Sequence, residues 1–296
     1  MTVELGTPGV DGLSKVAGVL REWQYDGAPM QLHPGDLGWF WRFGAEATAT
    51  AVRTWSHNGQ ILPAGLLDGP TLLRLAIAPD AQQDEELARQ LVVDVVDPER
   101  GVLVAGEVSV DAPQGALVRA RLSENGWNAD EPWTPLRCDL TEPVQDPGVR
   151  IELIGPEQAY VRTAVHRASF DRSTFTDERW HMMAAGSLYA DARCLVAYDD
   201  QGNAVAAATV WWAGPDKPGL LEPVGVHREH RGRGYGTAIT IAAAATLQEL
   251  GSSSAVVCTP SSNIGAVATY RSAGFQQLPE TRDQCRDIRI DVAARP

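Results

Sequence analysis

The segment REHRGRGYGTAI (residues 228–239) combines residue types that bind anions. Before a predicted helix it has three glycines and three arginines: Gly232, Gly234, Gly236, Arg228, Arg231 and Arg233. A helix N-terminus offers unpaired N–H groups and a partial positive charge, and glycine lets a ligand approach the backbone closely. Arginine adds forked donors that suit phosphate oxygens. The segment therefore predicts a phosphate or pyrophosphate site.

Three other interpretations remain open for this segment alone. A dinucleotide-binding turn needs G-x-G-x-x-G and an acidic residue about 20 positions later. Here the glycines are spaced G-x-G-x-G, and the next acidic residue, Glu249, falls at a helix end. An arginine–glycine segment for RNA is usually long and disordered, whereas this one lies between a strand and a buried helix. The third interpretation is a tight turn with solvated arginines.

The elements that must position the segment can be predicted from periodicity and turn residues. Downstream of a polar stretch at 139–150, we expect strands and helices in this order: strand 149–154, helices 156–169 and 177–188, strands 193–199, 204–212 and 220–226, helix 236–250, strand 254–259, helix 263–274 and strand 286–292. This order predicts a mixed sheet covered by helices, of the α/β class, and not a run of βαβ units.

The first half of the chain repeats this pattern at an offset of about 148–149 residues. TLLRLAIAPD (71–80) aligns with GLLEPVGVHRE, and GVLVAGEVS (101–109) aligns with SSAVVCT. In the first copy, Gln82, Gln83, Asp84 and Glu85 stand where Arg231 to Gly234 stand in the second. Two carboxylates at a helix start repel a phosphate, so we expect the first copy to have lost the anion site.

The run from residue 220 to 275 resembles the GNAT superfamily of N-acetyltransferases. The acyl-CoA motif of that family, Arg/Gln-x-x-Gly-x-Gly/Ala, is met by Arg231, Gly234 and Gly236. A second motif on the next helix is met by Asn263, Ala266, Tyr270, Gly274 and Phe275. The resemblance covers about 150–292 well and the first half in outline. It implies two GNAT-like domains, each a mixed, mostly antiparallel central sheet flanked by helices: a degenerate one at 1–145 without the acyl-CoA loop, and a catalytic one at 149–296.

The resemblance also implies acetyl-CoA as cosubstrate and a set of residues that bind it. In the resembled fold the strands before and after the loop helix splay apart, and pantetheine lies in the gap. Backbone groups near Val224 and Val226 would bind the pantetheine amides. The loop would hold the pyrophosphate, and Arg231, together with Arg233 or Arg228, would add positive charge. The expected set is Val224, Val226, Arg231, Gly232, Arg233, Gly234, Tyr235, Gly236, Thr237 and Asn263.

Acetyl transfer to an amine needs a base for the amine and a proton for the departing thiolate. Glu222, in the strand that enters the loop, is the candidate base, because a partly buried carboxylate has a raised pKa. A surface strand residue is the alternative for this position, and His227, His230 and His181 are rival bases. Tyr270 matches the family position whose hydroxyl faces the CoA sulfur; the alternative is a core aromatic residue. Asn263 is also expected to cap its helix.

The acceptor is expected to meet residues 170–183 and the end of the strand at Trp211. The candidate acceptor-binding residues are Phe175, Trp180, His181 and Trp211, with packing in the core as the alternative. The first function predicted is an acetyl-CoA-dependent N-acetyltransferase that acts on a primary amine of a small molecule by direct attack on the thioester. The alternatives are a protein or peptide N-acetyltransferase and a non-catalytic acyl-CoA sensor.

Composition excludes several classes. The net charge of −13 argues against general nucleic-acid binding, and residues 1–148 carry most of it, with 22 Asp and Glu against 10 Lys and Arg. No apolar run approaches a membrane span, and the N-terminus does not resemble a signal peptide. The four cysteines form no CxxC pair, so neither a metal nor a disulfide framework is expected. We expect a cytoplasmic monomer or homodimer.

Overall fold

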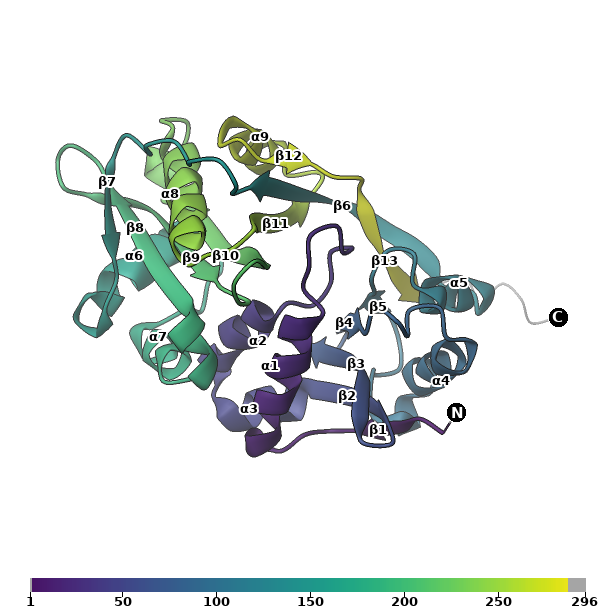
Figure 1. Cartoon of the computed structure of the whole chain (residues 1–296). Coiled ribbons are helices and arrows are strands. Elements are labelled where there is room, and N and C mark those ends of the chain that lie inside the picture. Colours follow the sequence, from purple (N-terminus) through teal and green to yellow (C-terminus); the bar gives the residue numbers. More distant parts are fainter. Residues whose placement is uncertain (1, 287–296) are drawn as a thin grey trace.

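The computed structural model describes residues 2–286, and its strands form one continuous sheet with helices packed around it (Figure 1). The strands are β1 (Glu4–Gly6), β2 (Val52–His57), β3 (Gln60–Leu67), β4 (Leu72–Ile77), β5 (Val108–Asp111), β6 (Asn128–Asp139), β7 (Arg150–Leu153), β8 (Ala192–Tyr198), β9 (Ala204–Trp211), β10 (Pro218–Val226), β11 (Ser254–Pro260), β12 (Gln276–Gln277) and β13 (Thr281–Arg286). The helices are α1 (Leu13–Glu22), α2 (Pro34–Phe40), α3 (Ala45–Ala51), α4 (Glu85–Val96), α5 (Leu117–Glu124), α6 (Ala159–Ser169), α7 (Asp177–Ala184), α8 (Tyr235–Glu249) and α9 (Ile264–Ser272). Beyond Arg286, the strand predicted at 286–292 lies outside the described residues.

The order of the strands repeats in the two halves of the chain. Across the sheet it is β1-β2-β3-β4-β5-β13-β6-β11-β10-β9-β8-β7. Each half thus contributes a run of antiparallel strands that ends in one parallel pair, β4 with β5 and β10 with β11. Helices α4 and α5 follow β4 and β5 as α8 and α9 follow β10 and β11. This agreement supports the duplication that the sequence predicts, and the mixed, mostly antiparallel sheet agrees with the predicted fold class.

The two halves exchange their last strands at the centre of the sheet. Strand β6, from the first half, pairs with β11 of the second half from Trp133 to Asp139. Strand β13, from the second half, lies between β5 and β6 and pairs with both. Figure 1 shows these two long strands crossing the space between the helical groups at either end of the molecule. The division into domains at 145–149 therefore stays a prediction, because backbone pairing crosses it.

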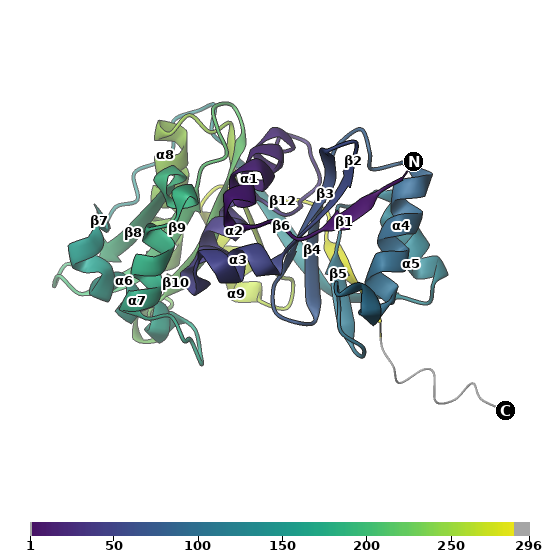
Figure 2. The same cartoon turned by 90° about the horizontal axis from the view of Figure 1, so that it is seen from below.

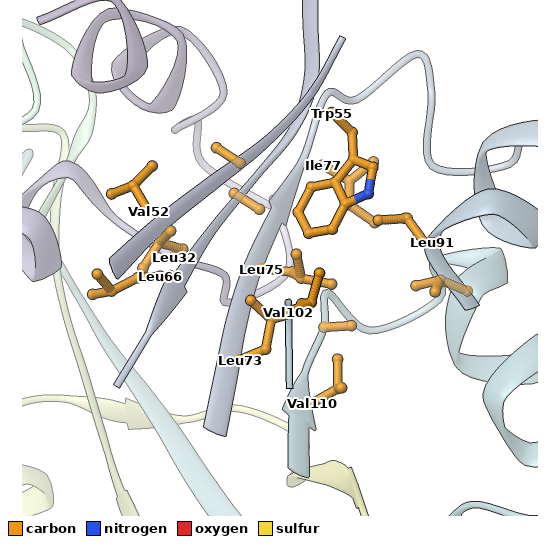
Figure 3. Packing of buried hydrophobic residues seen from close by; sticks show 14 of the residues in the cluster. Leu32, Val52, Trp55, Leu66, Leu73, Leu75, Ile77, Leu91, Val102 and Val110 are labelled. Carbon is orange, nitrogen blue, oxygen red and sulfur yellow. The ribbon is translucent and has the colours of Figure 1, made fainter. Parts of the chain in front are cut away.

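Each half has its own hydrophobic core. In the first half, α1 and α4 pack on strands β2 to β5, and Trp55, Leu75 and Leu91 lie together there (Figure 3). In the second half, alternate residues of β9 face opposite sides: Ala206 and Ala208 pack with α8, while Ala207 packs with α6 and α7. Figure 2, seen from below, shows α8 separated from α6 and α7 by these strands. No described helix meets the length and hydropathy of a transmembrane segment.

Helix α2 of the first half packs directly on the second half. A Cβ atom added to Gly35 would lie 2.4 Å from Cβ of Trp211, and one added to Gly38 would lie 2.2 Å from the ring of Trp211. Only glycine therefore permits this contact. Trp39, at the end of the same helix, contacts the rings of Phe175 and His166, at 5.0 Å and 5.6 Å between centroids. Trp39 of the first half therefore packs against the second half. Helix α2 is thereby fixed beside β10.

Candidate active site

The glycine loop forms an uncapped helix start. Gly232 and Gly234 have φ values of 75° and 87°, a left-handed conformation that disfavours other residues. Gly234 is the N-cap of α8, and no side chain accepts a hydrogen bond from the first turn of this helix. The first N–H groups of α8 are therefore available to a ligand, and the helix dipole favours an anion. These residues fit a pyrophosphate.

Two of the arginines hold the loop against helix α6. Arg231 donates a hydrogen bond to the carbonyl of Ser169 at 2.7 Å, and Arg228 donates to the carbonyl of Ala168 at 2.8 Å. Both carbonyls belong to the last turn of α6, where carbonyl groups lack partners within the helix. The arginines thus fix the loop as well as adding positive charge beside it.

Strands β10 and β11 separate just before the loop, as the sequence predicts. They pair only from Pro218 to Leu220, and β10 then has an irregularity in its pairing with β9 between Leu221 and Val224. A cleft of about 720 Å³ extends from this gap to the glycine loop. Its lining includes every residue predicted to bind the cosubstrate except Arg233, namely Val224, Val226, Arg231, Gly232, Gly234, Tyr235, Gly236, Thr237 and Asn263.

A second cavity, of about 390 Å³, lies on the other side of the gap, between the two halves of the chain. It shares part of its wall with the cleft, at Phe170, Val224, Asn263, Ala266 and Tyr270. Glu222 lines this second cavity, as do residues of the first half such as Asp36 and Arg74. A molecule in the cavity and the reactive end of a molecule in the cleft would therefore meet at the shared wall.

Glu222 is a carboxyl group with a strongly raised proton affinity. Its pKa is raised to about 8, first by burial and then by the negative charge of Asp36, while the guanidinium of Arg74 acts in the opposite direction. The backbone carbonyl of Glu222 accepts a 2.7 Å hydrogen bond from Nε1 of Trp211, which fixes this point of β10. A carboxyl with a pKa near 8 exchanges protons at the pH where amines react.

Tyr270 projects from α9 to the wall that both cavities share. The side chain is 7% exposed, and burial raises the pKa of its phenol, with the charges of Glu222 and Cys258 adding to the shift. The phenol therefore stays protonated near neutral pH. Its hydroxyl has no hydrogen-bonding partner within residues 2–286, so it is free to donate to a ligand. On the same helix, the side chain of Asn263 caps the N-terminus by accepting from the N–H of Ala266 at 3.2 Å, as predicted.

The four residues predicted to bind the acceptor line neither cavity. Phe175, Trp180 and Trp211 are at most 3% exposed and belong to the core of the second half. His181 lies on the exposed face of α7. Trp211 instead supports helix α2 and the backbone of Glu222. An acceptor-binding role for these four residues stays a prediction, and their positions favour packing for the three aromatic residues.

Sequence reasoning did not assign the charged residues that the first half contributes to the second cavity. These are Asp36 on α2, Asp68 after β3, Arg74 on β4 and Asp111 on β5. The acidic balance of residues 1–148 was the one available signal. It could not place these side chains near Glu222, since that depends on how the first half packs against the second, as α2 with Asp36 does against Trp211.

Comparison with known families decides the class of the second half. Residues 160–275 match the family model described as Acetyltransferase (GNAT) family. This segment is a GNAT acetyltransferase domain. It contains the glycine loop, Glu222, Tyr270 and the whole of the cleft. No curated protein sequence matches the chain significantly.

Solved structures extend the GNAT fold over both halves. A GCN5-related N-acetyltransferase from Sphaerobacter thermophilus is similar with a TM-score of 0.59 at 19% identity, covering 97% of this chain and 96% of that one. A tandem GNAT protein from the clavulanic acid biosynthesis pathway gives 0.61 at 15% identity, with 96% and 98% covered. A GNAT-family acetyltransferase from Colwellia psychrerythraea gives 0.58 at 14% identity, with 96% and 99% covered. At these identities the likeness shows the fold.

The first half has the strand and helix order of the GNAT domain but a closed helix start. The side chain of Asp84 caps α4 by accepting from the N–H of Leu87 at 2.8 Å, where α8 has an uncapped glycine. The free edge of β4 is also occupied, because Leu75 and Ile77 bond to Leu32 and to the side chain of Gln31. In the GNAT domain, the corresponding gap beside β10 is the cleft. In the first half, residues of the protein itself thus occupy the helix start and the strand edge that are open in the GNAT domain.

Proposed function

We propose that the protein transfers an acetyl group from acetyl-CoA to a primary amine of a small molecule, by direct attack of the amine on the thioester. The chain is a GNAT-family acyltransferase, and this family uses acetyl-CoA as its cosubstrate. The observation that carries the proposal is the meeting of two cavities at one wall, with Glu222 on one side and Tyr270 at the junction. The cleft suits the cosubstrate, and the second cavity suits the acceptor.

A small acceptor is favoured over a protein by the walls of the second cavity. Both halves of the chain contribute to it, and its volume of about 390 Å³ falls in the range of small-molecule sites. A peptide acceptor needs an open groove that lets a chain enter and leave. The residues around Glu222 are buried or half-buried, including Asp36 on α2, so they favour a small acceptor at this point over an extended chain.

Glu222 and Tyr270 supply the two proton transfers that the reaction needs. As the amine nitrogen bonds to the carbonyl carbon, the carboxylate of Glu222 takes the proton that the nitrogen loses. As the carbon–sulfur bond breaks, the phenol of Tyr270 gives a proton to the sulfur. Acetyl-CoA supplies the activated acyl group, and the uncapped start of α8 holds its pyrophosphate.

Direct attack is favoured over an acyl-enzyme by the state of the one cysteine in this region. Cys258 lines the second cavity, which we call the acceptor cavity, but burial raises the pKa of its thiol to about 12. A thiol with so high a pKa is almost entirely protonated at neutral pH and is a poor nucleophile. Cys258 is therefore not activated to form an acetyl-cysteine intermediate.

The proposal is tested by measuring thiol release from acetyl-CoA with a panel of acceptors. The panel contains amino acids, polyamines, aminoglycosides and peptides with free lysine side chains. We expect release that depends on a small primary amine and a product heavier by one acetyl group. Turnover with peptides alone would show that the acceptor is a peptide and not a small molecule. Tight acetyl-CoA binding without turnover on any amine would favour a non-catalytic acyl-CoA sensor.

Substitution of Tyr270 by Phe separates a proton donor from a core residue. The change keeps the ring and removes a hydroxyl that has no partner within the described chain, so the melting temperature should change by about a degree or less. Turnover should fall by roughly 10- to 1,000-fold, with acetyl-CoA affinity nearly unchanged. Rate, binding and melting temperature are measured on the same preparation.

The matched control for this variant is Tyr198→Phe. Tyr198 is also buried, lines neither cavity and interacts through its hydroxyl with Glu152. This change should lower stability and leave turnover intact, the opposite signature. Near-normal turnover of Tyr270→Phe at saturating acetyl-CoA would remove Tyr270 from the mechanism.

A further inference from the structure

We infer that the first half of the chain builds the acceptor-binding wall, and that this wall selects an acceptor with two cationic groups, one to be acetylated and one to be held. The inference rests on the proposed function, because it concerns the acceptor of the same reaction. It assigns a task to a half that has closed its own cosubstrate site. The class of acceptor is a diamine or polyamine.

The charges that line the acceptor cavity are strongly unbalanced. Among the residues that the structure describes, five carboxyl groups line the cavity with one guanidinium group: Asp36, Asp68, Asp111, Glu222 and Asp283 with Arg74. Arg119, outside the lining, also acts on Asp111 and Asp283. Three of the five carboxyl groups belong to the first half. The buried imidazole of His33 adds no positive charge, because burial lowers its pKa to about 4 and its two nitrogens bond the N–H of Gly35 and the carbonyl of Pro218. The cavity therefore favours cations.

Arg74 is already paired with carboxylates of the first half. Nη1 of Arg74 lies 2.8 Å from Oδ1 of Asp36, and its Nε lies 3.5 Å from Oδ2 of Asp111. These contacts use two of the three nitrogen atoms of the guanidinium group. The carboxylate of an amino acid would compete with these contacts for the guanidinium group. The geometry thus disfavours zwitterionic acceptors.

One carboxyl group on the cavity wall lacks a partner. Asp283 on β13 forms no ion pair or hydrogen bond within the part of the chain that the structure describes. The register of Gln284 with Val110 brings it beside Asp111 on the neighbouring strand, where like charges oppose each other. Burial and the charges of Asp111 and Asp130 raise the pKa of Asp283 to about 7, although Arg74 and Arg119 act in the opposite direction. A cation between the two carboxylates would remove the repulsion.

The two parts of the wall are well separated. Glu222 lies on β10, next to the cosubstrate cleft, while Asp111 and Asp283 lie on β5 and β13, with β6 and β11 between them in the sheet. A second ammonium group held at Asp111 and Asp283 therefore belongs to an extended acceptor. Asp36 and Arg74 lie between Glu222 and Asp111, because Arg74 contacts both Asp36 and Asp111. The charge of Asp36 also raises the pKa of Glu222.

The test compares acceptors of equal length and different charge. The probes are n-butylamine, 1,4-diaminobutane and 4-aminobutyrate, and the corresponding eight-carbon compounds. We expect kcat/KM to be about ten- to a hundredfold higher for a diamine than for its monoamine, the size of one charge-assisted contact, and lowest for the amino acid. Equal kcat/KM values for diamine and monoamine at both lengths, or a preference for the amino acids, would overturn the inference and leave the acetyltransferase activity in place.

The matched variants locate the selectivity. Asp283→Asn should reduce the ratio of kcat/KM between diamine and monoamine by about tenfold or more, mainly through KM, with CoA binding retained as evidence of folding. Asp80→Asn, an exposed carboxyl group in the same half as Asp111, should leave the ratio unchanged. If Asp283→Asn does not fold, Asp68→Asn at the exposed end of the cavity takes its place.

A binding measurement decides the case in which none of these amines is acetylated. 1,8-Diaminooctane is titrated by calorimetry into protein saturated with CoA, beside n-octylamine. Tighter binding of the diamine that Asp283→Asn abolishes supports the inference, even though the proposed reaction would need another acceptor. Binding that does not distinguish the two amines, or that is insensitive to Asp283→Asn, overturns it.

Discussion

Replacement of Glu222 by Gln should lower turnover at pH 7–8 by roughly 100- to 10,000-fold, the range for loss of a general base. Gln keeps the size of the side chain and cannot take a proton from the amine. The loss should be partly recovered at higher pH, since the free amine then needs no base. Steady-state rates over pH 6–10 with saturating acetyl-CoA measure this.

The pH dependence of the wild-type protein should show the same group. Because its pKa is about 8, Glu222 is protonated below that pH and cannot act as a base, so turnover should rise with pH up to about 8. The charged groups that act on it are Asp36, Asp68 and Arg74 of the first half. The inflection should be absent in Glu222→Gln.

Stability should change in the opposite direction to activity. The pKa of Glu222 is raised in the folded protein from an ordinary value of 4.5, so between pH 4.5 and about 8 the folded state keeps a proton that the unfolded chain has lost. The free energy of unfolding therefore falls as pH rises through this window. Glu222→Gln should melt higher than wild type above pH 8 and close to it near pH 4.5.

Glu249→Gln provides the control, because Glu249 is exposed at the end of α8 and lines neither cavity. It should leave both rate and melting temperature as they are. Unchanged turnover in Glu222→Gln would point to His230, which lines the cleft, or to bulk water as the acceptor of the proton.

Substitution of Gly234 by Asp should abolish CoA binding while the fold persists. The new carboxylate would lie at the start of α8, where we propose that the pyrophosphate binds, and would place a negative charge at the helix start as Asp84 does in the first half. Affinity should fall by about a hundredfold or more, because several charge-assisted bonds are lost together. Asp tolerates the left-handed conformation at this position better than most residues, so the strain is moderate.

Calorimetry with CoA also tests the stoichiometry. The wild-type protein should bind one CoA per chain, because the first half caps α4 and fills the edge of β4. Gly251→Asp is the matched control: it has φ of 83°, open space around it and lies at the opposite end of the same helix. It should lose comparable stability and still bind one CoA. Two equivalents on the wild type, or normal binding by Gly234→Asp, would contradict the loop assignment.

The cosubstrate half of the site could be predicted because it is local in sequence. The strand, the glycine loop and the helix follow one another between Pro218 and Glu249, and glycine readily adopts the backbone conformation of Gly232 and Gly234. Tyr270 and Asn263 follow on the next helix. The same locality explains why the fold class and the closed first copy could be predicted from turn and cap residues such as Asp84.

The acceptor side could not be predicted, because its contacts join distant residues. Arg74 and Asp36 are 38 residues apart, and Asp36 reaches Glu222 only because Gly35 and Gly38 let α2 approach Trp211. A tryptophan in a strand gives the same sequence signal whether it contacts a ligand or supports a helix. Asp283 belongs to a strand that inserts into the other half of the sheet, a pairing that periodicity does not reveal.

The exchange of β6 and β13 has a consequence for how such a chain can evolve. After a duplication, a copy that has lost its ligand site is normally free to be deleted or to drift. Here each copy holds a strand of the other in its own sheet, and deletion of either would remove the strand that pairs with β11 or with β5 of the survivor. The shared strand pairing therefore favours retention of the first copy. Its surface beside Glu222 can then change under selection.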